Sequence, residues 1–76
     1  MVDREKIKMG MMELMAMRTE EVEKAVKDPV EFPKALKEYE QARAVVIKLD
    51  VDVSEYDKRR NKSREDYGNA HSGVML

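Results

Sequence analysis

Two arginines occupy unusual positions in the sequence, because each falls within a pattern of apolar residues. Arg18 lies near the centre of the apolar stripe of a first predicted helix, and Arg43 lies inside the edge of a second stripe. A hairpin folded about residues 30–31 would bring them to the same level, where two guanidiniums could bind a phosphate or a carboxylate. The alternative is that Glu21 and Glu40, each three residues from its arginine, neutralise them while the arginine stems pack over apolar neighbours.

A basic cluster in the last third of the chain could contact nucleic acid. It places five positive charges within seven residues and has a tyrosine near each end: Tyr56, Lys58, Arg59, Arg60, Lys62, Arg64 and Tyr67. Interleaved basic and aromatic side chains can bind phosphates and stack on exposed bases. Four flanking acids nearly cancel the charge, so a solvated and internally paired helix is the favoured interpretation. These acids are Glu55, Asp57, Glu65 and Asp66.

Methionines concentrate near the start of the chain, where five of the seven lie between residues 9 and 17. Met11, Met12 and Met15 fall on or beside the apolar face of the first predicted helix. Methionine is unbranched and polarisable, so a surface rich in it can adapt to irregular partners, although it can equally fill a small core or self-interface. Met9 and Met17 point away from the main stripe. If both are exposed, this helix has apolar surface on two sides, which favours contact with another chain.

Signals for catalysis and metal binding are weak. His71 is the single histidine and cysteine is absent, so a zinc site or a Ser–His–acid arrangement would depend on one residue near the end of the chain. Residues 50–54 resemble the opening of a calcium loop, but Glu55 stands where glycine is required. Most carboxylates fall on polar faces, where no burial would tune them for acid–base chemistry. We therefore expect no enzyme activity, no metal and no cofactor.

The composition narrows the class of protein further. The chain has 76 residues with 15 Lys+Arg against 16 Asp+Glu, so it lacks the overall positive field of a dedicated nucleic-acid binder. No stretch approaches the roughly 18 apolar residues that a membrane-spanning helix needs, and no secretory signal is recognisable at the start. We therefore expect a cytoplasmic protein without membrane contact.

The elements that must position these residues are helices. A first helix is predicted from residue 3 to about 27, because apolar residues recur at spacings of three and four: Ile7, Met11, Leu14, Met15, Val22, Ala25 and Val26. Pro29 and Pro33 end it. A second helix is predicted over about 33–49, because its apolar residues follow a 4-3-4-3 pattern: Ala35, Tyr39, Ala42, Val46 and Leu49.

The remaining segments are less clearly patterned. Residues 47–53 alternate apolar and polar side chains as a strand would, but a single strand would need a partner from another molecule, so we end the second helix near Leu49. A short third helix is predicted over about 54–67, with Ser54 as its N-cap. Residues 68–76 have the composition of a flexible tail, and the role of Val74-Met75-Leu76 stays open.

The sequence therefore predicts an all-α protein, an antiparallel helical hairpin with a short third helix. It forms one small domain over residues 1–67, followed by a flexible tail over 68–76. A chain of this size without disulfides is marginal alone, because a domain of about 60 residues buries only about 60% of its unfolded surface. A second copy would help to bury the apolar face.

Our leading hypothesis is a non-enzymatic protein–protein interaction module that self-associates and modulates a partner protein. Small helical proteins of this sort are frequent among regulators and bacteriophage accessory proteins. The residues expected to supply its apolar contacts are Met11, Met12, Met15 and Val22, while Arg18 and Arg43 would fix orientation. The alternative is an anion-binding module, with nucleic acid at residues 58–64 or a small phosphate compound at the two arginines. The identity of the partner, its pathway and the oligomer number stay open.

Overall fold

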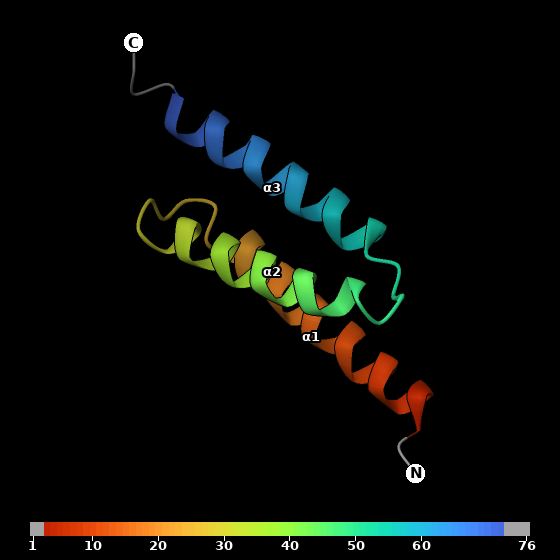
Figure 1. The fold of residues 1–76 in the computed structure, drawn as a ribbon. Helices are drawn as coiled ribbons and strands as arrows, with labels where there is room; N and C mark the ends of the chain where they lie inside the picture. Colours follow the sequence, from red (N-terminus) through yellow and green to blue (C-terminus); the bar gives the residue numbers. More distant parts are fainter. Residues whose placement is uncertain (1–2, 73–76) are drawn as a thin grey trace.

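The computed structural model describes residues 3–72, which form three helices (Figure 1). These are α1 (Arg4–Lys24), α2 (Glu31–Ile47) and α3 (Ser54–Ser72). Helices α1 and α2 form an antiparallel hairpin, and α3 packs on it in the same direction as α1. The described residues contain no strand, so the predicted all-α hairpin with a third helix is confirmed, and residues 48–53 form the loop between α2 and α3.

Aspartate side chains cap the first turns of α1 and α2. The Asp3 side chain accepts a hydrogen bond of 3.0 Å from the backbone N–H of Glu5. The Asp28 carboxylate accepts bonds from the backbone N–H groups of Val30 (2.9 Å) and Glu31 (3.1 Å), and these bonds hold its pKa below the usual range. Helix α2 thus begins two residues before Pro33, which fits within the first turn because the N–H groups there need no partner inside the helix.

The connection from α2 to α3 is capped in the same way. Asp50 adopts a left-handed conformation with φ of 59°, which reverses the chain after α2. The Asp52 carboxylate then accepts bonds from the backbone N–H of Ser54 (2.9 Å) and from its hydroxyl (2.7 Å). Ser54 is therefore the first residue of α3, and Asp52 provides the cap that we had assigned to Ser54.

The core lies between the three helices and contains the apolar stripes of both hairpin helices. Its buried side chains are Met15, Val22, Ala25, Phe32, Ala35, Tyr39, Ala42, Val46 and Val53. Thr19 is also fully buried, and its hydroxyl donates a 2.6 Å hydrogen bond to the carbonyl oxygen of Met15. The first four positions of the predicted 4-3-4-3 pattern are buried, whereas Leu49 lies beyond the end of α2 and is 39% exposed.

Helix α3 is longer than its sequence pattern predicts, because aromatic rings hold its last turns on the hairpin. The ring of Tyr67 stacks on that of Phe32 with centroids 4.2 Å apart and planes 5° apart, and His71 packs on Tyr67 at 4.3 Å. Residues 68–72, predicted as tail, are therefore helical. Residues 73–76, including Val74-Met75-Leu76, lie outside the described part of the chain.

The three helices are staggered along a rod. The molecule measures 58 × 19 × 16 Å, whereas a 21-residue helix such as α1 is only ~31 Å long. The first turns of α1 extend past the other helices at one end, and the last turns of α3 extend toward the other end (Figure 1). Within residues 3–72, no helix combines the length and the apolar character needed to cross a membrane.

Candidate functional site

The structure places Arg18 and Arg43 in separate ion pairs. A terminal nitrogen of Arg18 lies 3.2 Å from both oxygens of Glu21 and 3.2 Å from Glu38, so this arginine joins α1 to α2. Arg43 instead forms a two-pronged contact with Asp57, with bonds of 2.9 and 3.0 Å, and joins α2 to α3. Because each guanidinium has carboxylate partners of its own, this geometry gives no support to a shared anion site.

Asp57 is the centre of a network that the sequence did not reveal. Besides Arg43, it accepts a 2.7 Å hydrogen bond from the hydroxyl of Tyr39, and a nitrogen of Arg60 lies 3.9 Å away. The guanidinium of Arg43 holds the pKa of Asp57 below its usual range, while burial and the bond to Asp57 raise the pKa of Tyr39. The network joins α3 to α2, and the bonds from Tyr39 and Arg43 to Asp57 span 18 and 14 residues, so no local spacing could show them.

The cations of the basic cluster largely contact acids of this chain. Arg59 pairs with Glu23 on α1 at 2.6 Å, and the Arg59 bond holds the pKa of Glu23 below its usual range. Arg60 pairs with Glu40 on α2 and also lies over the ring of Tyr39, 5.3 Å from its centre. The amine of Lys58 lies 3.6 Å from an acid one turn earlier on α3. These three cations therefore carry intramolecular pairs, two of which dock α3 on the hairpin.

The two tyrosines of the basic cluster are also engaged within the chain. The Tyr56 hydroxyl donates a 3.3 Å hydrogen bond to the carbonyl oxygen of Met12, and the Tyr67 ring is stacked on Phe32. The Tyr67 ring therefore has one face covered and is poorly placed to stack on a nucleic-acid base. Two further basic residues of the cluster are exposed: Lys62 and Arg64.

The four predicted interface residues differ in exposure. Met15 and Val22 are completely buried in the hairpin core, so in this arrangement they contact their own chain. Met11 is half-buried, and Met12 is 47% exposed. The burial of Met15 and Val22 follows from their place on the side of α1 that faces α2 and α3. Of the four, Met12 is therefore the most open to a partner, and the other exposed apolar side chains of α1 lie outside the predicted set.

The other exposed apolar side chains of α1 are methionines outside the main stripe. Met9 is 62% exposed and Met17 is 47% exposed, so α1 does carry apolar side chains on two sides. Together with Met12 they form what we call the outer methionine surface. Spacing alone placed Met9 and Met17 outside the main stripe, but only the packing of α2 and α3 shows that these residues stay uncovered.

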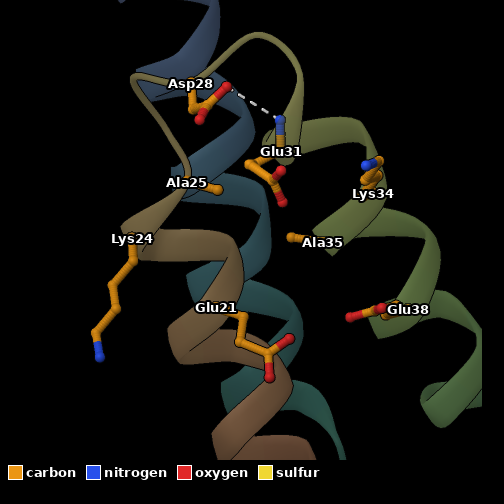
Figure 2. A pocket seen from close by; sticks show the side chains of 8 residues that line it. All are labelled: Glu21, Lys24, Ala25, Asp28, Glu31, Lys34, Ala35 and Glu38. Carbon is orange, nitrogen blue, oxygen red and sulfur yellow. Dashed lines mark hydrogen bonds between the residues drawn. The ribbon is translucent and has the colours of Figure 1, made fainter.

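An open groove of about 440 Å³ lies between α1 and α2 (Figure 2). Ala25 and Ala35 point toward one another across it, and its remaining lining is charged: Glu21, Lys24, Asp28, Glu31, Lys34 and Glu38. Glu21 and Glu38 are already bound by Arg18, and Asp28 caps α2. Within residues 3–72, no group of three or more histidines or acids is arranged to hold a metal ion.

Comparisons with known proteins give no family for this chain. It matches no protein-family model, no curated protein and no solved structure. A binding site on this chain is therefore to be sought among the side chains that the fold leaves at the surface without partners inside the chain. By that criterion the outer methionine surface is the strongest candidate site, because the candidate arginines and much of the basic cluster already have partners.

Proposed function

We propose that this protein is a small, non-enzymatic interaction module that binds other protein chains through the outer methionine surface of α1 and modulates what it binds. The observation that carries this proposal is the exposure of Met9, Met12 and Met17, at 62%, 47% and 47%. The core is filled without them. Single exposed apolar residues are common, but three large ones on one stretch of one helix form a patch suited to partner binding.

The chemistry of the patch supports a protein partner. Methionine side chains are flexible and polarisable, so they can adjust to the shape of an apposed helix or groove without a preformed pocket. The three side chains of the patch lie outside the buried stripe of α1, and α2 and α3 leave them exposed. A partner could therefore approach this helix without displacing α2 or α3.

The alternative, an anion-binding module, has less support. A phosphate at Arg18 or Arg43 would have to compete with Glu38 or Asp57, both of which are already hydrogen-bonded to these guanidiniums. Four acids flank the five cations of the basic cluster in the sequence and nearly cancel its charge. We therefore do not propose nucleic acid or a small phosphate compound as the ligand.

The test replaces the three exposed methionines by glutamate and compares binding with a matched control. Val45→Glu is the control, because Val45 is 54% exposed on α2 and lies outside the outer methionine surface. Circular dichroism first establishes that both variants remain helical. Binding is then measured as self-association in the centrifuge and as capture of proteins from an extract of the source cells.

The expected result is a loss of binding in the methionine variant only. Burying a carboxylate without a partner carries a large desolvation cost, so affinity should fall at least about tenfold. Val45→Glu should bind as the unmodified chain does. If the folded methionine variant retains both self-association and the same captured proteins, the outer methionine surface is not the binding site.

A further inference from the structure

We propose that one exposed face of α1 binds a second copy of this chain, with the two α1 helices crossing antiparallel at Met9 and Gly10. This face consists of Lys6, Met9, Gly10, Glu13 and Met17. This inference rests on the proposed function and adds the partner and its geometry. In this arrangement Met9 of each copy lies over Gly10 of the other. Lys6 of each copy lies opposite Glu13 of the other, on both sides of the crossing point.

The face is defined by helical spacing. Lys6, Met9, Gly10, Glu13 and Met17 are separated by three, one, three and four residues, so they share one side of a helix that has 3.6 residues per turn. All five are exposed. The buried residues of α1 occupy the opposite side, where α2 and α3 pack. A second helix can therefore lie along this face without meeting either of them.

Nothing within a single copy of the chain requires glycine at position 10. Glycine weakens a helix relative to alanine, and Gly10 lies inside α1. A Cβ atom built at this position would have nothing within 4 Å, and its φ is not positive, so neither crowding nor backbone conformation requires glycine. A missing side chain does allow another backbone or a long side chain to approach closely. The adjacent Met9 is the side chain that a second copy would bring to this gap.

The charges on this face favour a second copy in the antiparallel direction. A two-fold axis between positions 9 and 10 pairs residues whose numbers sum to 19, which brings Lys6 opposite Glu13 twice. A parallel pair would instead place like charges opposite each other. Glu13 has no basic residue three or four positions away on α1, so a partner would supply its cation.

The contact between the two α1 helices is small, so we expect a weak dimer. A stable interface buries about 800 Å² on each partner, which a single crossing of two helices does not reach. The dimer should therefore be reversible, with monomer and dimer exchanging as concentration changes. Such a dimer also leaves Met12, on the flank of the crossing, open to other proteins.

The first experiment compares Gly10→Ala with Gly68→Ala by sedimentation equilibrium over a range of concentrations. Gly68 is the matched control, because it is also an exposed glycine inside a helix, with nothing within 4 Å of a built Cβ. Both changes should raise the Tm at concentrations where the chain is monomeric. Only Gly10→Ala should weaken the dimer, by about tenfold, because its methyl group fills the gap that Met9 enters. Equal dimerisation of Gly10→Ala and the unmodified chain would overturn the proposal.

The second experiment tests the direction of the crossing by exchanging charges. Lys6→Glu and Glu13→Lys should each weaken the dimer, while the double variant should restore affinity to within about threefold of the unmodified chain. Two weak single variants without rescue would exclude the antiparallel pairing.

The two proposals can fail separately. If the unmodified chain is monomeric at every concentration, a second copy is not the occupant and this inference is overturned. The glutamate variants of the outer methionine surface still test the proposed function in that case, through the proteins captured from extract. If those variants lose captured proteins while the chain stays monomeric, the module binds other proteins only.

Discussion

The network around Asp57 gives the sharpest test of how this fold is held together. In Asp57→Asn the amide keeps the shape of the side chain, but its nitrogen cannot accept a hydrogen bond and the negative charge is gone. The carboxylate accepts the Tyr39 hydroxyl at 2.7 Å and two Arg43 nitrogens at 2.9 and 3.0 Å. The variant therefore loses one acceptor position and the charge of the pair while α3 keeps its apolar contacts.

The size of the effect follows from the burial of the pair. A hydrogen bond to a charged group contributes about 1.5–3 kcal/mol, and a fully buried ion pair costs about 3–5 kcal/mol to break. The side chains of Asp57 and Arg43 are 19% and 33% exposed, so solvent screening places the expected loss nearer the lower range, at about 2–3 kcal/mol. For a domain of this size that corresponds to a fall in Tm of about 10–20 °C.

The assay is thermal and urea unfolding followed by circular dichroism, with Glu23→Gln as the control. Glu23 also pairs with an arginine of α3, but the two side chains are 38% and 42% exposed. An exposed pair contributes only about 0–1 kcal/mol, so this control should change the free energy of unfolding little. Equal effects of the two substitutions would refute the argument that burial makes the Asp57 network the stronger clamp.

The same network predicts a dependence on pH. Because Arg43 lowers the pKa of Asp57 in the folded state, the stabilisation that this carboxylate provides is fully present at pH values above its unfolded pKa of about 4. It is lost as the pH falls through the lower folded value. Asp57→Asn removes this group, so the variant should lose less stability than the unmodified chain between about pH 5 and pH 2. Parallel stability curves for the two chains would contradict the assignment.

Two further substitutions test the elements that set the ends of α3. Phe32→Ala should lower the free energy of unfolding by about 3–5 kcal/mol, because Phe32 is 3% exposed, and should speed amide exchange most in the last turns of α3, where Tyr67 loses its stacking partner. The exposed Val30→Ala is its control, and unchanged exchange near Tyr67 in Phe32→Ala would exclude the stacking as the anchor. Asp52→Ala should lower the Tm by a few degrees through loss of the cap at Ser54, while Asp52→Asn should retain most of it. An unchanged Tm in Asp52→Ala would show that the cap does not limit stability.

Local patterns in the sequence are enough to predict the helices and the buried side of the hairpin. Three residues of the apolar stripe predicted on the first helix are buried: Met15, Val22 and Ala25. The first four positions of the 4-3-4-3 pattern on the second helix are buried as well: Ala35, Tyr39, Ala42 and Val46. These patterns are local, because a helix places residues three or four apart on one face whatever packs against it. The same rule placed Met9 and Met17 outside the buried stripe, and both are exposed.

Which charges meet, and where α3 ends, depend on how the helices pack against one another. The partners Arg43 and Asp57 are 14 residues apart, and Tyr67 meets Phe32 from a different helix, so no spacing within one element could pair them. Helix α3 has no apolar stripe, and its extension to Ser72 depends on rings that only docking brings together. The same packing explains why Met9 and Met17 are exposed, because α2 and α3 cover the other side of α1.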